Sequence, residues 1–412
     1  MMKNFYTLIL LFCFGFNAVA QVNVPGCDGT RYIEDVFPTV TKTTVTYGYN
    51  INTLGQNQEL KMDVYTPDGD TLSNRPVIIW AFGGSFIVGQ RADMAQHCIA
   101  FAKKGYVTAT IDYRLWPLLQ KGFPTGEQIL GVVVQAVSDM KGSIRYFRKD
   151  ADQGNQFGID PARIIVGGYS AGSVTALHVA HLDPQDSLPP LISNAINANG
   201  GMNGNTGDSL MLTYPTDVLS CINLSGGLYE ADWIDANSPA FVSYHGDADG
   251  TVPYESGIAN GLLYIEGSKL LKERSDAVGV NNYFVTVPGG GHTDSYTDQK
   301  FASYFNEFWT NTFSFLEDLV CGASTSTTEP NGVKEIISSP NPANNFVKID
   351  LPSAGNYTVE LINTIGKVNR ILNVNNNNQL TIERENLPAG MYFIKINSTT
   401  GINQYVSRVV FY

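Results

Sequence analysis

The sequence predicts an α/β fold with a doubly wound, mostly parallel sheet, followed by a small C-terminal β-sandwich. From Val77 to about Leu319, short apolar segments of strand character alternate with amphipathic stretches of helical period. This alternation is typical of a parallel sheet with helices on both faces. After a polar stretch that ends at Asn331, the chain becomes rich in asparagine and in β-forming residues that alternate apolar and polar. Short alternating strands of this kind indicate a sandwich.

The strands that precede Val77 are expected to run antiparallel, because Val45–Tyr49 and Leu60–Tyr65 alternate apolar and polar residues. A long helix is predicted over Gly126–Asp150, where apolar side chains recur on one face: Ile129, Val132, Val133, Ala136, Val137, Met140 and Ile144. The Asn- and Gly-rich stretch Asn194–Asp208 can supply little core. It is either a lid over a site or a long surface loop.

The first twenty residues have the composition of an export signal. Lys3 supplies a weakly basic start, Phe5–Phe16 is apolar, and Ala18–Ala20 offers small residues before Gln21. The apolar run is too short to span a bilayer as a stable helix. We therefore expect a signal peptide over 1–20 and a mature chain that begins near Gln21.

The 412 residues are too many for one ordinary domain. We expect a main domain over 21–321, a polar linker over 322–337 and a separate domain over 338–412. The hydrophobic content of 43% and the charged content of 16% are those of folded domains with a sizeable core. A largely disordered chain is thereby excluded.

A candidate nucleophile stands at Ser170. The strand-like run Arg163–Val166 leads into Gly167-Gly-Tyr-Ser-Ala-Gly172, and a helix-compatible stretch follows directly. G-x-S-x-G between a strand and a helix presents the serine hydroxyl on a sharp turn, whereas the motif without these flanks is an ordinary glycine-rich turn. Gly168 and Gly172 remove Cβ atoms that would clash where strand and helix meet. The helix that follows aims free N–H groups at the place where an oxyanion would form.

A second buried strand, Val77–Trp80, ends in Gly83-Gly84-Ser85. Paired glycines at a strand end let the backbone turn and approach a ligand closely. In serine hydrolases with a strand–turn–helix nucleophile, an early loop and the residue after the nucleophile supply the oxyanion donors. We therefore expect the backbone N–H groups of Gly84, Ser85 and Ala171 to form an oxyanion hole. An ordinary tight turn is the alternative.

The candidate acid lies in the loop after the apolar strand Phe241–His245, where the chain reads Gly-Asp247-Ala-Asp249-Gly. A carboxylate in this loop can reach across the carboxyl edge of the sheet. Asp247 can instead be a turn residue that hydrogen-bonds its own backbone. Asp249 is therefore the preferred group to orient a histidine and balance its charge.

His292 is the candidate base among the five histidines of the chain. It follows the acid in a glycine-rich loop, ahead of a C-terminal helical pattern, and so completes the chain order Ser, Asp, His. The other four lie in helical segments or at a strand end ahead of the acid: His97, His178, His181 and His245. The predicted triad is therefore Ser170, Asp249 and His292.

Four segments have the character of family motifs: Trp80–Phe86, Ile111–Leu115, Phe157–Ile164 and the H-G-x-x-D-x-x-V-P pattern from His245. Together they make residues 40 to 315 resemble an α/β-hydrolase of the carboxylesterase kind. In relatives with the last pattern the later aspartate is the triad acid, which implies Asp249 here. The oxyanion loop departs from the family at Phe82 and Ser85, where many members have His and a third Gly. A backbone donor survives the change to serine, but loop flexibility and substrate shape can differ.

The formal net charge of −12 belongs to the main domain, because from residue 335 on six basic and five acidic side chains nearly cancel. An acidic protein does not favour nucleic acid or an anionic membrane as a partner. It also repels polyanionic substrates mildly and so favours neutral esters.

Cysteine usage leaves several pairings open. Cys13 falls in the expected signal, and the four cysteines of an exported chain permit up to two bridges in three connectivities. Cys98 lies on an apparent helix face and Cys221 in an apolar strand, so buried thiols suit that pair equally well. Cys27 and Cys321 bracket the main domain, which makes a bridge between its ends one option. No C-x-x-C or histidine cluster suggests a metal site, and we expect no cofactor.

The residues 338–412 contain three clear strand patterns with turn signals between them: Phe346–Leu351, Tyr357–Ile362 and Met391–Ile396, with turns at Asn363–Gly366 and Leu387–Gly390. These alone suggest a carbohydrate-binding or adhesive module. The Pro-Asn-Pro opening at 340–342, Ile365–Lys367 and the basic, apolar end Arg408–Tyr412 are more specific. With them the tail resembles the type A C-terminal sorting domain of the type IX secretion system. The resemblance implies that machinery as a partner, and release or attachment at the cell surface.

Together these features predict a secreted serine esterase that cleaves carboxylic esters through an acyl-enzyme. Its substrate would be a small-molecule or polymer-linked ester, and export favours acetyl or feruloyl esters of polysaccharides. A peptidase or thioesterase on the same fold is one alternative, because a triad does not encode the leaving group. A catalytically inactive surface-binding protein is the other.

Overall fold

The computed structural model describes residues 24–322, 333–336, 338–363, 368–398 and 404–412. The chain divides into two compact units, Met1–Ala323 and Ser324–Tyr412, which are described separately. The predicted signal peptide, 1–20, and most of the predicted linker, 322–337, lie outside the described residues. Within the described ranges, no helix combines the length and apolar character that crossing a membrane requires.

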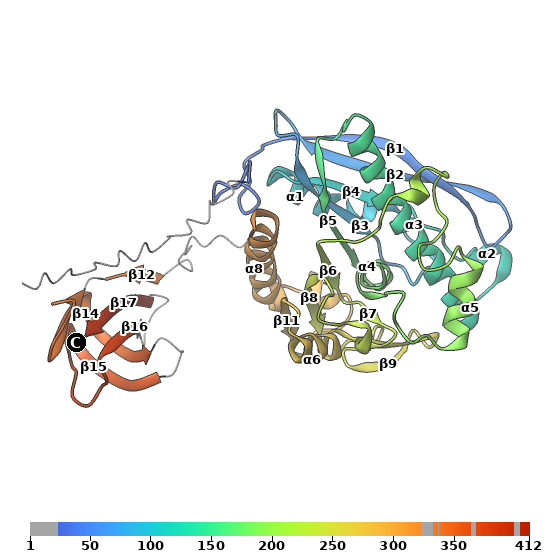
Figure 1. The fold of residues 1–412 in the computed structure, drawn as a ribbon. Coiled ribbons are helices and arrows are strands. Elements are labelled where there is room, and N and C mark those ends of the chain that lie inside the picture. Colours follow the sequence, from blue (N-terminus) through green and yellow to red (C-terminus); the bar gives the residue numbers. More distant parts are fainter. Residues whose placement is uncertain (1–23, 323–332, 337, 364–367, 399–403) are drawn as a thin grey trace, which may run out of the picture. The chain divides into compact units, whose positions relative to one another are not determined.

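The first unit is organised around one mixed sheet with the strand order β1-β2-β4-β3-β5-β6-β8-β11 (Figure 1). The strands are β1 (Val40–Ile51), β2 (Asn57–Pro67), β3 (Arg75–Ala81), β4 (Val107–Ile111), β5 (Ile159–Tyr169), β6 (Ser220–Leu224), β8 (Ala240–Gly246) and β11 (Asn282–Val287). β2 runs antiparallel to both β1 and β4, and the other neighbours are parallel. The predicted doubly wound, mostly parallel sheet with antiparallel leading strands is therefore confirmed.

Helices cover both faces of this sheet (Figure 1). α1 (Ala95–Lys103) and α8 (Ala302–Cys321) lie on one face, and α3 (Gly126–Gln153) and α4 (Ala171–His181) pack together on the other. The remaining helical segments are α2 (Leu118–Lys121), α5 (Pro190–Ala198), α6 (Ser268–Val278), α7 (Asp294–Thr297) and the 3₁₀ turns η1 (Arg91–Met94), η2 (Met211–Thr213), η3 (Ala231–Trp233) and η4 (Gln299–Phe301).

The α3 helix begins where the sequence predicts and extends three residues past the predicted end, to Gln153. Thr125 caps its first turn, since the Thr125 hydroxyl accepts the N–H of Gln128 and the Gln128 side chain accepts the N–H of Thr125. Every apolar residue of the predicted face is buried. The helix therefore forms because one apolar stripe packs on the sheet.

On the opposite face, aromatic rings fill the space between the sheet and two helices. Trp80 of β3 contacts His97 and Phe101 of α1 and Trp309 of α8, with ring centroids 5.2, 5.8 and 6.4 Å apart. Burial lowers the pKa of His97 to about 4, so this histidine is a neutral core residue.

The Asn- and Gly-rich stretch 194–208 is packed rather than loose. Its first residues complete α5, and the buried Thr206 donates to Asp139 Oδ1 at 2.7 Å on α3. Asp139 also pairs with the buried Arg114, at 2.8 Å. A Cβ at Gly204 would lie 2.5 Å from the Ser138 hydroxyl. The stretch is therefore a surface segment held against α3.

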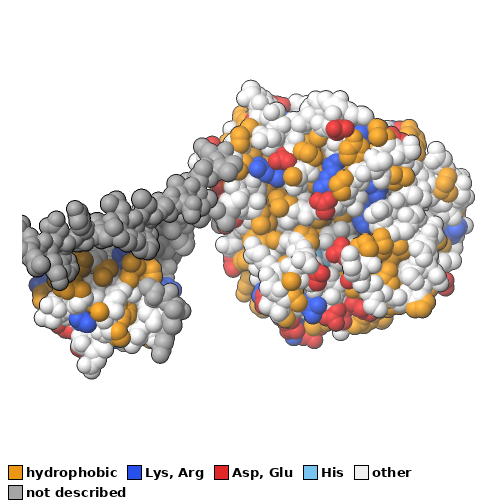
Figure 2. Space-filling view, in the orientation of Figure 1, with side chains coloured by type: hydrophobic (Ala, Val, Ile, Leu, Met, Phe, Trp, Pro, Cys, Tyr) orange, Lys and Arg blue, Asp and Glu red, His pale blue; other side chains and the backbone are white. Residues whose placement is uncertain are grey.

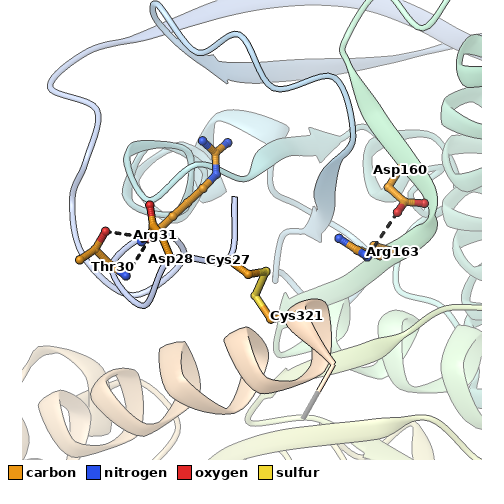
Figure 3. The surroundings of a disulfide bond; sticks show 7 residues. All are labelled: Cys27, Asp28, Thr30, Arg31, Asp160, Arg163 and Cys321. Atoms are coloured by element: carbon orange, nitrogen blue, oxygen red, sulfur yellow. Dashed lines mark hydrogen bonds and ion pairs between the residues drawn. A yellow bond between two sulfur atoms is a disulfide. The ribbon is translucent and has the colours of Figure 1, made fainter. Parts of the chain in front are cut away.

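A disulfide joins Cys27 to Cys321, at the end of α8, across a sequence separation of 294 residues (Figure 3). Cys98 and Cys221 are buried free thiols. Beside the bridge, Asp28 Oδ1 accepts the N–H groups of Thr30 and Arg31 at 2.9 and 2.8 Å. The bridge therefore ties together the two ends of the first unit. Cross-links that close long loops typically stabilise a fold by about 2–4 kcal/mol.

A second, smaller sheet has the order β7-β10-β9. It consists of β7 (Gly227–Leu228), β9 (Ser256–Ala259) and β10 (Leu263–Gly267). β9 and β10 form an antiparallel hairpin between β8 and α6, and β10 also pairs with β7. The sequence analysis did not predict this hairpin.

The second unit is a β-domain with the sheet order β12-β17-β16-β14-β13, in which β15 also pairs with β14. Its strands are β12 (Val333–Glu335), β13 (Ser338–Ser339), β14 (Phe346–Asn363), β15 (Val368–Glu383), β16 (Gly390–Ser398) and β17 (Gln404–Phe411). β14 pairs with β13 in its first half and with β16 in its second, and its pairing with β15 shifts register between Asp350 and Tyr357. The sheet thereby wraps around a buried apolar core of its own.

Two details of this unit differ from the prediction. The expected strands Phe346–Leu351 and Tyr357–Ile362 are parts of one long strand, β14, because the segment between them keeps an extended backbone. β12 lies within the segment predicted as linker and pairs with β17, so the β-domain begins before residue 338. The predicted turn at Asn363–Gly366 lies almost wholly outside the described residues.

On the face of the first unit that Figure 2 shows, acidic and basic side chains are interspersed with apolar ones. No broad basic patch is visible among the described residues of this face. This distribution agrees with the net charge of −12 and offers no electrostatic footprint for nucleic acid there.

Candidate active site

The loops that carry the predicted site follow parallel strands at one edge of the main sheet. β3 pairs with β5 up to Ala81 and Gly168, and β8 pairs with β11 up to Gly246 and Val287. β6 connects the two pairs. The carboxyl ends of parallel strands meet at one edge, which is where open α/β sheets bind ligands. The oxyanion, nucleophile, acid and histidine loops therefore share that edge.

Ser170 lies on a turn of unusual backbone conformation between β5 and α4, with φ 54° and ψ −121°. A Cβ at Gly168 would lie 2.2 Å from the carbonyl carbon of Gly172, and a Cβ at Gly172 would lie 2.0 Å from Ala81 O. Only glycine fits at either position, because strand and helix meet there at backbone distance. A non-glycine residue at positive φ is strained, and such strain gathers at functional sites.

The Ser170 hydroxyl lies next to His292. Its Oγ is 2.8 Å from His292 Nε2, although the two residues are 122 positions apart in sequence. Tyr169 lies under the imidazole: its ring stacks on that of His292 at 5.3 Å, and its hydroxyl donates to His292 O at 3.0 Å. Tyr169 was missed in the sequence analysis, although it occupies the variable position before the motif serine. It limits where the His292 loop can lie.

The Asp249 carboxylate holds the other side of the imidazole. Its Oδ2 lies 2.6 Å from His292 Nδ1, and its Oδ1 accepts the N–H groups of Thr251 and Val252 at 2.8 and 2.9 Å. Since a carboxylate can only accept, His292 carries its proton on Nδ1 and leaves Nε2 free to accept from Ser170. Burial opposes ionisation of Asp249, but hydrogen bonds from His245 and His292 outweigh it and hold the pKa of this carboxyl well below its usual value.

Asp247, the alternative candidate for the acid, bonds to the backbone of a neighbouring loop. It is exposed, and its Oδ1 accepts the N–H of Gly289 at 2.6 Å. It therefore ties the acid loop to the loop that carries His292, rather than bonding the imidazole or its own turn.

His245 is a second histidine at the acid, and the sequence analysis passed over it. It is fully buried, with Nε2 3.2 Å from both Asp249 Oδ2 and Val252 O, and Nδ1 2.8 Å from Ser268 Oγ. The Val252 carbonyl can only accept, so the proton sits on Nε2 and Nδ1 accepts from Ser268. Asn223 in turn donates to Ser268 Oγ at 2.9 Å. The H-G-x-x-D pattern already joins His245 to Asp249 at a spacing of four residues, but in the sequence analysis it served only to choose the acid.

The two histidines of α4 are kept neutral by burial. His178 and His181 are buried along α4, and burial lowers their pKa values to about 4 and about 3. With His97, they are neutral core residues.

A pocket lies beside Ser170 and involves two of the three predicted oxyanion residues. Ser85 and Ala171 line this pocket together with Ser170, whereas Gly84 is not among its lining residues. Gly84 instead forms the turn: its carbonyl accepts the N–H groups of Ile87 and Val88 at 3.0 and 3.1 Å. None of the residues from 194 to 208 lines the pocket, so the structure gives no support to a lid there.

Two families match separate parts of the chain. Residues 62–202 match the BD-FAE family, and residues 339–411 match the secretion system C-terminal sorting domain. The first match includes the oxyanion loop and Ser170 and ends ahead of Asp249 and His292. The second covers nearly all of the described β-domain.

Individual proteins are similar over shorter stretches. Bile salt-activated lipase of Mus musculus is 29% identical over 186 residues, 43% of this chain and 29% of the lipase. Fumonisin B1 esterase of Sphingopyxis macrogoltabida is 31% identical over 121 residues, 28% of this chain and 21% of that protein. The chain therefore spans less than a third of the length of these relatives.

Among solved structures, esterase 2 of Thermogutta terrifontis, phosphorylated by paraoxon, aligns with a TM-score of 0.49 and 20% identity. The alignment covers 68% of this chain and 95% of that chain. The two family matches, over residues 62–202 and 339–411, assign the two parts of the chain. The chain carries a BD-FAE domain of the esterase and lipase type of α/β-hydrolases, followed by a type IX secretion C-terminal sorting domain, which marks it for the cell surface or the outside.

Proposed function

We propose that the protein is an exported serine esterase in which Ser170, His292 and Asp249 form the catalytic triad. The observation that carries the proposal is the continuous hydrogen-bonded chain from the Ser170 hydroxyl through His292 to Asp249. In this mechanism Ser170 Oγ attacks the ester carbonyl while His292 Nε2 takes its proton. Asp249 fixes the imidazole tautomer and stabilises the imidazolium that forms.

The tetrahedral oxyanion would be held by the backbone N–H groups of Ser85, Ala171 and Gly84. Ser85 and Ala171 are the better supported donors, because both line the Ser170 pocket, and Ala171 opens a helix whose first N–H groups have no intrahelical partner. Each donor is worth about 3 kcal/mol of barrier. His292 then protonates the leaving alcohol, and water repeats the sequence on the acyl-enzyme.

The substrate class is inferred from the chemistry of the proposed triad and from the export of the protein that the sorting tail implies. A triad needs neither metal nor organic cofactor to cleave an ester. The sorting tail directs the protein toward extracellular material, and the acidic first unit favours neutral substrates over polyanions. We therefore propose small or polymer-linked carboxylic esters, with acyl groups on polysaccharides as the natural source.

A direct comparison of leaving groups tests this function. The purified protein should hydrolyse p-nitrophenyl acetate and release acetate from acetylated xylan. Cleavage of an aminoacyl anilide or an acyl thioester in preference to these esters would instead identify a peptidase or a thioesterase. Absence of turnover on all of them would indicate a surface-binding protein.

We propose that His245 positions Asp249 rather than touching substrate. Replacing His245 by Ala should reduce kcat/KM by about 10- to 100-fold, as is common when a group behind a functional side chain is lost. Loss of one donor raises the pKa of the Asp249 carboxyl toward its usual value, so the activity lost through protonation of this group should be lost at a higher pH in the variant than in the wild type. His245→Gln, whose amide N–H can still donate to Asp249, should restore part of both properties.

The two measurements separate positioning from folding. If His245→Ala lowered the melting temperature but left the pH profile in place, the residue would be structural only. A glutamine variant no better than alanine would contradict the hydrogen-bond explanation in the same way.

Removal of the tail should separate export from catalysis. A chain that ends at Ala323 keeps all predicted site residues and both cysteines of the bridge. It should therefore fold and hydrolyse small esters with kinetics close to those of the mature protein. In a host with type IX secretion it should remain in the periplasm, as cell fractionation would show.

Either half of this prediction can fail alone. Loss of small-ester activity on truncation would mean that the β-domain completes the catalytic fold. Undiminished export would contradict the sorting role, and a loss confined to insoluble polysaccharide would make the tail a binding module.

A further inference from the structure

The β9–β10 hairpin forms one wall of the pocket at Ser170. Five residues of the hairpin and its turn line that pocket: Ala259, Asn260, Leu262, Leu263 and Ile265. The other lining residues come from the oxyanion loop, α3, the nucleophile turn with α4, and the acid loop: Ser85, Phe86, Ile129, Ser170, Ala171, Val174 and Val252. Apart from Ser170, Ser85 and Asn260, every lining side chain is apolar. The pocket therefore accommodates an aliphatic group directly beside the nucleophile.

The pocket is small. Its cavity volume is about 40 Å³, whereas pockets for drug-sized ligands span about 300–1,000 Å³. A cavity needs about 10–15 Å³ of such volume for one water, so this one holds a group of about three water-sized atoms. A polymer chain cannot enter it. When the alcohol of an ester belongs to the polymer, as in an acylated polysaccharide, only the acyl arm can occupy it.

Asn260, in the turn of the hairpin, hydrogen-bonds to two neighbouring loops, once through its side chain and once through its backbone. Asn260 Nδ2 donates to Ser85 Oγ at 2.7 Å, and Asn260 N donates to Thr251 O at 3.1 Å. The same Thr251 donates its N–H to Asp249. Asn260 therefore connects the hairpin tip to the oxyanion loop on one side and to the acid loop on the other.

The backbone is left-handed on both sides of this contact, which is unfavourable at Ser85 and Phe86 and tolerated by the asparagine at 260. Ser85 has φ 56°, its neighbour Phe86 has φ 61°, and Asn260 has φ 49°. Left-handed conformations are unfavourable for serine and phenylalanine, and they persist where surrounding structure imposes them. Glycine would adopt the Ser85 conformation without strain. Serine has a backbone cost there, and its hydroxyl accepts the hydrogen bond from Asn260 that glycine could not accept.

We propose that the Ser85–Asn260 hydrogen bond latches the β9–β10 hairpin over a short acyl pocket, and that the enzyme is therefore selective for acetyl and similarly short acyl esters. This inference rests on the proposed esterase function and names its acyl group. It also decides between the two acyl classes that export favours, because a feruloyl group carries an aromatic ring that this pocket does not admit. The alcohol arm, including a sugar of a polysaccharide, stays outside.

Acyl selectivity is tested with four p-nitrophenyl esters of one leaving group: acetate, butyrate, octanoate and ferulate. For the wild-type enzyme kcat/KM should be highest for acetate and fall steeply toward octanoate and ferulate. In Asn260→Gly, which keeps a left-handed backbone while removing the latch, the acetate-to-octanoate ratio should fall by about tenfold, the low end of what one methylene contributes in an apolar pocket. Ser85→Gly should shift the ratio in the same direction.

Two further variants sharpen the result. The double variant should shift the ratio no further than Asn260→Gly alone, because both substitutions remove one hydrogen bond. Ile258→Ser is the matched control: Ile258 belongs to the same hairpin, is 56% exposed and does not line the pocket, so its acyl profile should equal that of the wild type. Melting temperatures of all variants show whether each is folded.

The outcomes distinguish this inference from the function on which it rests. Equal use of acetate and octanoate, or of acetate and ferulate, by the wild type would overturn the short acyl pocket while leaving an esterase. An unchanged profile in folded Asn260→Gly would overturn the latch, and so would additive shifts in the double variant. No turnover of any of the four esters would overturn the esterase function itself.

Discussion

Replacement of Ser170 by alanine is expected to lower kcat for ester hydrolysis by about 10⁴-fold or more. The serine Oγ lies 2.8 Å from His292 Nε2 at the end of β5, so its removal deletes the attacking atom and leaves the rest of the site in place. Residual rate enhancement would then come from the oxyanion donors and from binding alone. Steady-state kinetics on p-nitrophenyl acetate measure the effect.

A control and a labelling experiment complete this test. Ser193 lies on α5 and does not line the Ser170 pocket, so the Ser193→Ala variant should retain wild-type turnover. An organophosphate should label Ser170 in the wild-type enzyme and no residue in the Ser170→Ala variant. Retention of a tenth of the activity, or labelling of another serine, would show that Ser170 is not the nucleophile.

The second large effect is expected at Asp249. Asp249→Asn replaces the carboxylate that accepts from His292 Nδ1 at 2.6 Å, so the imidazole loses both its fixed tautomer and the charge that stabilises its protonated form. Turnover should fall by roughly 10⁴-fold. Asp247→Asn is the matched variant, because an asparagine carbonyl can still accept the N–H of Gly289 and the side chain is exposed. It should change turnover little.

Kinetics of the two variants, with circular dichroism to confirm folding, decide the assignment. Comparable losses would leave the acid unassigned, and a larger loss at Asp247 would exchange the two roles. The low pKa that hydrogen bonds impose on Asp249 means that this carboxylate is already ionised throughout the pH range in which an esterase works. A loss of activity in mildly acidic solution should therefore not be attributed to its protonation.

Local patterns in the sequence were sufficient for the fold class and for the order of the candidate site. The strand–turn–helix setting of Ser170 is visible because G-x-S-x-G satisfies a steric demand between near neighbours, which the backbone distances at Gly168 and Gly172 illustrate. The long helix α3 and the antiparallel leading strands are likewise local patterns of burial. The family match and the sheet confirm the fold, while the roles of Ser170, Asp249 and His292 stay predictions that the variants above address.

The tertiary structure alone decided contacts between residues that are far apart in sequence. The sequence permitted three cysteine connectivities, and the bridge between Cys27 and Cys321 depends on how the first and last segments of the unit meet. The β9–β10 hairpin was missed because its strands have only four and five residues, too few for a clear period. The partnership of Asn260 with Ser85 spans 175 residues and leaves no periodic trace. Periodicity indicates which side of a helix or strand is buried, but only the packed chain determines which polar groups form hydrogen bonds with one another. In this protein one such hydrogen bond, between Asn260 and Ser85, lies at the pocket beside Ser170.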